Sequence, residues 1–266
     1  MKRLSFLFIL LIICVFNCPL GFSQGISNQW VLGYYGGGGN IIMNFKNDSL
    51  HISNLVWKMN FHDFNASVCN SHGNLLFYTN GGWIANAEND TMQNGNNLAP
   101  GNYASQWKGD GFRIVQGGLI IPFPEDSTKF YLFHETVYFD SLSNIIPCQN
   151  LLYSTIDMSL DSALGGVVVK NAVALNDSLI YGELTACKHA NGRDWWIFTH
   201  QQNTDLFFKF LITPMGITGP FLQNIGTIQT QAWPGQTCIS PDGKKYARYT
   251  QMMIWIFMIL IVVQVC

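Results

Sequence analysis

The sequence predicts an all-β fold, an incomplete β-propeller of four to five WD-repeat-like blades. Two observations predict it. A polar turn that leads into an aromatic-rich hydrophobic stretch recurs roughly every 50 to 65 residues, which is typical of propeller blades. The composition also suits many short strands and turns. The copies of the recurring segment lie at 73–79, 126–134, 191–200 and 241–249.

The composition limits the classes of function. Charged residues make up 11% of the chain and the formal net charge is −2, whereas soluble domains carry about 25% charged residues. Aromatic residues reach 14% and there are 25 glycines, a mixture that favours strands and turns. Lysines and arginines form no cluster, so we expect no nucleic-acid partner.

Each expected strand is a short apolar or aromatic stretch bounded by Gly, Asn, Asp or Pro turn signals. Helix should be nearly absent. The expected strands, in chain order, lie at 41–45, 50–57, 65–70, 75–80, 112–121, 129–138, 150–157, 167–170, 183–189, 194–200, 206–213, 236–239 and 245–249.

The first segment, 1–24, is expected to be a secretory signal peptide. It starts with two basic residues, continues with an apolar stretch at 4–16 that is too short to span a bilayer, and ends in small and polar residues. The mature chain then starts near Gly25. A lipoprotein signal acylated at Cys14 or Cys18 is the weaker alternative, because neither cysteine follows a small residue.

The last segment, 251–266, is an apolar tail that follows the expected propeller domain at 25–250. It resembles a membrane helix, but it has fewer apolar residues than the roughly 20 that a spanning helix needs. Read from the third base of the Gln251 codon, Met252 and its successors encode an Asp-rich strand. We therefore expect a frameshifted, truncated product and no genuine transmembrane span.

Four of the seven cysteines lie outside both end segments. Export would permit disulfides, and four cysteines allow three pairings, among which the sequence does not choose. No spacing matches a zinc or redox motif. We expect the last two of the four to be small buried hydrophobic residues. The four are Cys69, Cys148, Cys187 and Cys238.

Several motifs resemble a large family of secreted Bacteroidota proteins that end in gliding-motility-associated, type IX secretion sorting domains. The similarity covers the N-terminal propeller region of that family and runs from Trp30 to Thr250. It implies export through the inner membrane, then secretion or surface display of an intact member and a periplasmic location for a truncated one. The motifs are at 29–35, 74–82, 92–98, 118–124, 152–158, 184–192 and 239–245.

This resemblance favours a non-catalytic, adhesion-type interaction module with an unknown protein or glycan ligand at the cell surface. No catalytic, cofactor-binding or metal-binding residue is assigned, and no cofactor is expected. The alternative is a propeller glycoside hydrolase or lyase that acts on surface glycans, which needs two carboxylates across a sugar. The available carboxylates are Asp63, Asp110, Glu135, Asp157 and Glu183.

Other polar and aromatic features have structural interpretations. His134 and His200 end aromatic strands and show no metal-ligand spacing. The glycines at 36–39 precede no lysine or helical pattern, so we interpret them as a bend. The segment 94–97 is a turn signal with too few carboxylates for calcium. We expect partial burial, in preference to sugar stacking, for Trp83, Trp107 and Trp233.

Overall fold

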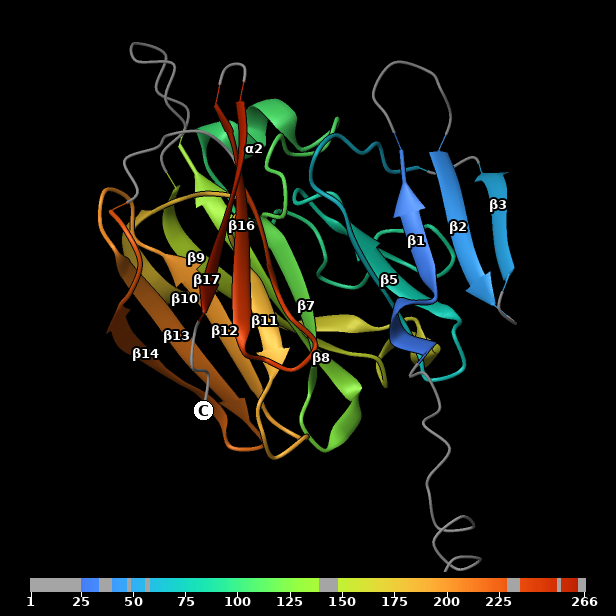
Figure 1. The fold of residues 1–266 in the computed structure, drawn as a ribbon. Coiled ribbons are helices and arrows are strands. Elements are labelled where there is room, and N and C mark those ends of the chain that lie inside the picture. The colour runs from blue at the N-terminus through green and yellow to red at the C-terminus, as the bar shows by residue number, and fades with distance from the viewer. Residues whose placement is uncertain are drawn as a thin grey trace, which may run out of the picture.

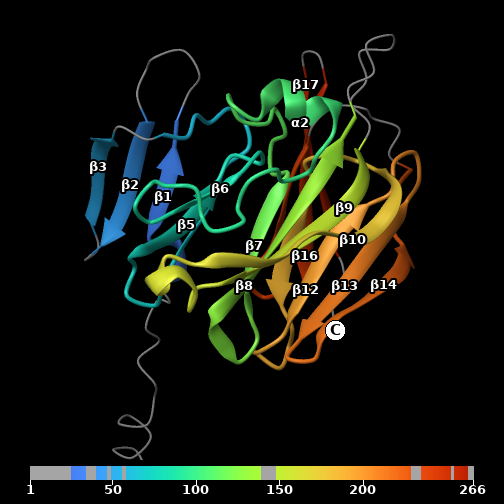
Figure 2. The ribbon, with the colours of Figure 1, turned by 180° about the vertical axis from the view of Figure 1, so that it is seen from behind.

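The computed structural model describes residues 25–33, 40–46, 49–55, 58–138, 148–228, 235–252 and 255–262, without the side chains of Leu55 and of residues beyond Tyr249. Over these residues the chain is all-β, with five antiparallel sheets and no closed barrel. The predicted signal peptide and the glycines at 36–39 lie outside the described residues. Figures 1 and 2 show the sheets from opposite sides.

Each sheet consists of strands that are consecutive in the sequence and pair with their chain neighbours. Sheets 1, 2 and 5 have three strands and sheets 3 and 4 have four. Sheet 1 contains β1 (Gln29–Leu32), β2 (Asn40–Lys46) and β3 (Ser49–Leu55), and sheet 2 contains β4 (Ala66–Cys69), β5 (Leu75–Thr79) and β6 (Ile84–Asn86). Sheet 3 contains β7 (Gly118–Phe123), β8 (Asp126–Val137), β9 (Cys148–Asp157) and β10 (Gly166–Leu179). Sheet 4 contains β11 (Thr185–Lys188), β12 (Trp195–His200), β13 (Leu206–Thr213) and β14 (Gly216–Asn224), and sheet 5 contains β15 (Gly235–Ile239), β16 (Lys245–Met252) and β17 (Trp255–Val262).

Helical structure is short. The α-helix α2 (Asn102–Trp107) has six residues and lies between sheets 2 and 3 in the sequence, and the 3-10 turns η1 (Gly25–Ser27) and η2 (Asp161–Ala163) have three each. This agrees with the expectation that helix is nearly absent. No helix among the described residues has the length and apolar character needed to span a bilayer.

Hydrophobic clusters join each sheet to the next one in the chain. Phe77 of sheet 2 meets Phe130 of sheet 3 edge to face, with ring centroids 5.5 Å apart. Phe207 of sheet 4 meets Tyr246 of sheet 5 in the same way, at 5.2 Å. The largest cluster lies between sheets 3 and 4 and includes Phe133. Such aromatic pairs add about 0.5–1.5 kcal/mol to the stabilisation from burial.

The four recurring turns all lie between the first and second strands of a sheet. In sheets 2, 4 and 5 a glycine there has a left-handed backbone, with φ of 79° at Gly73, 73° at Gly192 and 70° at Gly243. Side-chain oxygens stabilise these turns: Asn70 accepts bonds from the backbone N–H groups of His72 and Asn74. In sheet 3 the equivalent acceptor is Asp126, which binds the N–H of Thr128 at 3.0 Å.

Most of the expected strands are present, with differences at particular positions. The strand expected at 112–121 begins only at Gly118, and the strand expected at 167–170 extends over 166–179 with several bulges. Strands β1, β6, β14 and β17 were not expected. Gly219 and Pro220 interrupt the strand pattern of β14 in the sequence. The strand forms nevertheless, because β14 is an edge strand, where proline is tolerated.

Candidate active site

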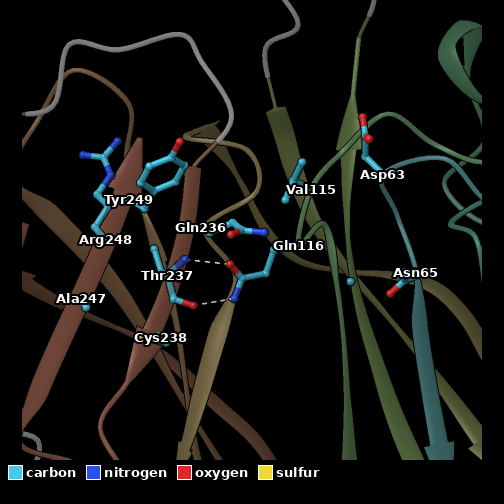
Figure 3. A pocket seen from close by; sticks show the side chains of 11 residues that line it. Asp63, Asn65, Val115, Gln116, Gln236, Thr237, Cys238, Ala247, Arg248 and Tyr249 are labelled. Carbon is cyan, nitrogen blue, oxygen red and sulfur yellow. Dashed lines mark hydrogen bonds between the residues drawn. The ribbon is translucent and has the colours of Figure 1, made fainter. Parts of the chain in front are cut away.

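A pocket of about 590 Å³ lies between sheets 2, 3 and 5, and we call it the inter-sheet pocket. Figure 3 shows its lining. Residues that precede β4 and β7, with the first residue of β7, form one side, and residues from β15 and β16 form the other. The described lining residues are Asp63, Asn65, Val115, Gln116, Gly118, Gln236, Thr237, Cys238, Ala247, Arg248 and Tyr249.

Gln116 fixes sheet 5 against the segment before β7. Its amide nitrogen donates to the carbonyl oxygen of Thr237 at 2.7 Å, and its amide oxygen accepts from the Thr237 N–H at 2.7 Å (Figure 3). The side chain therefore bonds the β15 backbone as a neighbouring strand would. Since both polar ends of the amide are used, Gln116 acts here as a structural residue of the pocket wall.

Arg248 lies on β16 with its side chain 3% exposed, and its Nε donates to Oε1 of the fully buried Glu183. Glu183 precedes β11, so this ion pair joins sheets 4 and 5. Gly235 makes room for it, because a Cβ at that position would lie 2.5 Å from the same carboxylate oxygen. The two terminal nitrogens of Arg248, Nη1 and Nη2, are buried and have no hydrogen-bond partner among the described residues.

A second buried carboxylate, Glu135, lies at the end of β8. Its Oε2 accepts a hydrogen bond from the Gly182 N–H at 2.7 Å, while Oε1 has no partner among the described residues. Burial raises the pKa of Glu135 to about 8, and the charge of Glu183 raises it further. Burial also raises the pKa of Glu183 to about 7, although Arg248 opposes that shift. Strongly shifted carboxyl groups of this kind are frequent at functional sites.

Two buried histidines lie on β8 and β12. Burial lowers the pKa values of His134 and His200 to about 4, and for His200 the charge of Arg248 adds to the effect. His134 Nε2 lies 3.4 Å from the Ser154 hydroxyl. Both histidines are therefore neutral at physiological pH. Among the described residues, no group of three His, Cys, Asp or Glu side chains is placed to hold a metal ion.

The five carboxylates considered from the sequence separate into two groups. Asp63 lines the inter-sheet pocket, and Glu135 and Glu183 are buried near its wall. Asp157 accepts hydrogen bonds from the N–H and hydroxyl of Ser159 and so closes a turn. Asp110 does not line the pocket. Because Asp63 is the one carboxylate among the described lining residues, the pocket lacks the facing pair that glycoside hydrolysis needs.

The other sequence candidates have structural roles where they are described. Trp83 and Trp107 are partly buried against hydrophobic clusters, as expected. The guanidinium carbon of Arg113 lies 3.6 Å from the centre of the Trp107 ring, so the two groups stack. Trp233 lies outside the described residues. In the 94–97 turn, the Lys170 ammonium donates to Oδ1 of Asn94 at 2.7 Å, so a lysine binds the oxygens that calcium would require.

Among the described cysteines, Cys69, Cys148 and Cys238 are free thiols. Cys69 and Cys148 are buried, but the expectation of burial is wrong for Cys187, which is half-buried, and for Cys238, which is exposed. Alternation along β15 explains the second case: Thr237 is buried, so its neighbour Cys238 lies on the opposite, exposed face of the strand.

Arg248 is a site residue that the sequence alone does not indicate as a candidate. The available signal is the alternation of β16, in which Tyr246 and Arg248 occupy buried positions two residues apart. A charged residue at a core-facing strand position requires a partner, which Glu183 supplies.

No family model and no curated protein matches the chain. Two solved structures are similar, each described as a "putative 6-phosphogluconolactonase". The protein from Bacteroides uniformis is 14% identical with a TM-score of 0.33, and the match covers 89% of this chain and 79% of that one. The protein from Bacteroides fragilis is 12% identical with a TM-score of 0.32, over 90% and 79% of the two chains.

These comparisons correct the expectation of a non-catalytic adhesion-type module, because both neighbours are described as enzymes. The lining of the inter-sheet pocket, with a single described carboxylate, goes against the alternative of a glycoside hydrolase or lyase.

Proposed function

We propose that the five sheets are consecutive blades of a β-propeller and that the inter-sheet pocket is the active site of a hydrolase. Its substrates would be lactones or esters of small hydroxy acids. The first strands of neighbouring sheets contact one another, β1 with β4, β4 with β7 and β11 with β15. The last strands β3 and β14 are largely exposed. Inner first strands and outer last strands are the arrangement of propeller blades.

One observation carries the functional proposal. Asp63, whose carboxylate is partly exposed, and Arg248, whose guanidinium is buried beside Glu183, are lining residues from opposite sides of the same pocket (Figure 3). The carboxylate can accept a proton from water, and the guanidinium can stabilise an oxyanion. Ester and lactone hydrolysis needs both functions within one cavity.

In the proposed reaction Asp63 takes a proton from a water molecule whose oxygen attacks the carbonyl carbon. The carbonyl π electrons move to the oxygen, and the positive charge of Arg248 stabilises the negative charge that forms there. The bond to the leaving alkoxide then breaks, and the proton held by Asp63 passes to that alkoxide. Glu183 does not touch the substrate, but its ion pair holds Arg248 in position.

The test is hydrolysis of D-glucono-δ-lactone and of p-nitrophenyl esters, measured as the rate above the uncatalysed background. Asp63→Asn should lower kcat by about 100-fold or more, since general-base catalysis contributes about 10²–10⁴-fold. Arg248→Lys keeps a positive charge but loses the planar fork, and it should lower kcat by about 10-fold or more.

Glu88→Gln is the matched control, because Glu88 is an exposed carboxylate outside the pocket. It should leave the rates unchanged. Turnover that persists in Asp63→Asn, or wild-type rates equal to background on every substrate, would reject the proposed reaction.

A further inference from the structure

Sheet 1 has one face that consists almost entirely of apolar side chains. Residues directly opposite each other in antiparallel strands lie on the same face. Trp30 is opposite Met43, and Met43 is opposite Ile52, so these three share a face. Alternation along each strand adds the remaining members. We call this surface the apolar face of sheet 1, and its described residues are Trp30, Leu32, Ile41, Met43, Phe45, Leu50, Ile52 and Asn54.

The other face of the sheet already has a partner. Val31 is buried there, and with Ile42 it packs in one cluster with Tyr78 of sheet 2. The apolar face of sheet 1, in contrast, takes part in none of the hydrophobic clusters that the described residues form. Sheet 1 lies at one side of the fold, with β3 outermost (Figures 1 and 2).

Large side chains on this face are open to solvent. Trp30 is 50% exposed and Ile52 is 59% exposed, while Leu50 and Phe45 are 47% and 37% exposed. The rings of Trp30 and Phe45 are in contact, with centroids 5.0 Å apart, so the patch is continuous from β1 to β2. An antiparallel sheet that packs on one side normally presents polar residues on the other. Sheet 1 departs from that pattern, and contiguous apolar patches of this kind mark interaction sites.

The absence of charge on this face indicates its occupant. None of its described residues is charged, so an identical face would meet no electrostatic repulsion. The ionisable side chains of β2 and β3, Lys46 and His51, lie on the opposite face by alternation. A charged ligand would find no ionic partner among the described residues of the face. An apolar, uncharged protein surface is therefore the matching partner, and a second copy of this chain supplies one.

The size of the patch is sufficient for a weak dimer. The four most exposed side chains leave about 400 Å² accessible, because large side chains bury about 150–250 Å² each when fully covered. Two copies would bury about 800 Å² from these side chains alone, and the half-buried Leu32, Ile41 and Met43 add to that area. The total is near the roughly 1,000 Å² that marks a specific interface.

We propose that the protein forms a two-fold symmetric dimer in which the apolar face of sheet 1 stacks on the same face of a second copy. A two-fold axis brings one patch against itself, as in most homodimers. Two sheets would then pack face to face, as in a β-sandwich. This inference is independent of the proposed hydrolysis, because no residue of sheet 1 is among the described lining residues of the inter-sheet pocket.

The first test is sedimentation velocity of the purified full chain between about 1 and 100 µM, where an interface of this size should associate. The wild type should pass from monomer to dimer over this range. Ile52→Glu places a charge in the centre of the contact and should raise the dissociation constant of the dimer at least 10-fold. A wild type that stays monomeric throughout, or an unchanged dissociation constant in Ile52→Glu, would overturn the proposal.

Leu222→Glu is the matched control for that substitution. Leu222 is 63% exposed on β14, an edge strand as β3 is, and it lies outside sheet 1. The same change from an apolar to an acidic side chain should shift the dissociation constant less than 2-fold. An equal loss of association in both variants would show that general surface hydrophobicity, and not the apolar face of sheet 1, drives the contact, and would reject the assignment.

Hydroxyl-radical footprinting locates the contact in the wild type, without any variant. The oxidation rate of Trp30, measured by peptide mass spectrometry, should fall at least 3-fold between the monomeric and the dimeric concentration. Met215, which is 95% exposed on the turn before β14, should be oxidised equally at both. A dimer without protection of Trp30 would place the contact elsewhere. Protection of Trp30 at the monomeric concentration would mean that another segment of the same chain covers the face. Either result would refute the proposal, and this measurement decides if Ile52→Glu does not fold.

Discussion

Replacing Glu135 by glutamine tests whether a buried carboxylate in this fold is neutral at physiological pH. In the wild type, burial raises the pKa of Glu135 to about 8, from an ordinary value of 4.5. Glutamine keeps an oxygen that can accept the hydrogen bond from Gly182, but it cannot ionise. The variant therefore removes one titration and leaves the shape of the side chain nearly unchanged.

The direction of the pH dependence of stability follows from how many protons the folded and the unfolded protein bind. Between pH 4.5 and 8 the folded protein holds a proton on Glu135 that the unfolded chain has lost, so wild-type stability falls as pH rises through this window. Each pH unit corresponds to about 1.4 kcal/mol per proton. Between pH 5 and 8 the free energy of unfolding of Glu135→Gln should rise relative to wild type by about 3 to 4 kcal/mol.

The assay is urea denaturation at pH 5, 6, 7 and 8, followed by tryptophan fluorescence. Only the difference between variant and wild type is used, because His134 and His200, with pKa values lowered to about 4, give both proteins the opposite slope between about pH 4 and 6.5. Glu88→Gln, at an exposed site, should show no pH-dependent difference. A difference for Glu135→Gln that stays constant over the four pH values would refute the reasoning.

Three further predictions concern packing, thiol exposure and the gene. Phe77→Ala should lower the free energy of unfolding by about 3–5 kcal/mol, because Phe77 is fully buried against Phe130 between sheets 2 and 3; a loss under 1 kcal/mol in urea denaturation would contradict this. In the native chain, Cys238 should react with a thiol reagent much faster than the buried Cys148, as peptide mass spectrometry can measure, and equal rates would argue against the described placement of β15. DNA read from the third base of the Gln251 codon should encode an Asp-rich strand and continue open past the Cys266 codon; a stop codon soon after the shifted segment, found by resequencing, would reject the frameshift.

Strand positions could be predicted where turn chemistry and alternation agree. The hairpin at 191–200 has an Asn-Gly turn followed by an aromatic strand, and the structure places β12 at Trp195–His200. Prediction failed where local signals conflict. The segment 112–117 is apolar enough to suggest a strand, but Gln116 has a left-handed backbone, with φ of 52°, and its side chain bonds β15. That contact joins residues 121 positions apart, so no local pattern contains it.

The candidate site was less predictable, because its residues come from separate sheets. Glu183 and Asp63 could be named as carboxylates, but the sequence does not show that one is buried beside an arginine while the other faces a pocket. The decisive residue, Arg248, resembles any strand residue until its burial is known. Sequence periodicity indicates which face of a strand a residue occupies, whereas the partner across the interface depends on how two distant sheets pack.

The ion pair between Arg248 and Glu183 is a costly way to join sheets 4 and 5. Two well-packed apolar side chains would bury the same positions without removing charges from water, and replacing a buried ion pair in this way is often neutral or stabilising. The cost is larger here because Nη1 and Nη2 of Arg248 and Oε2 of Glu183 have no partners among the described residues. Phe207 and Tyr246 already join the same two sheets through aromatic contact. Stability therefore gives little reason for an arginine at this position.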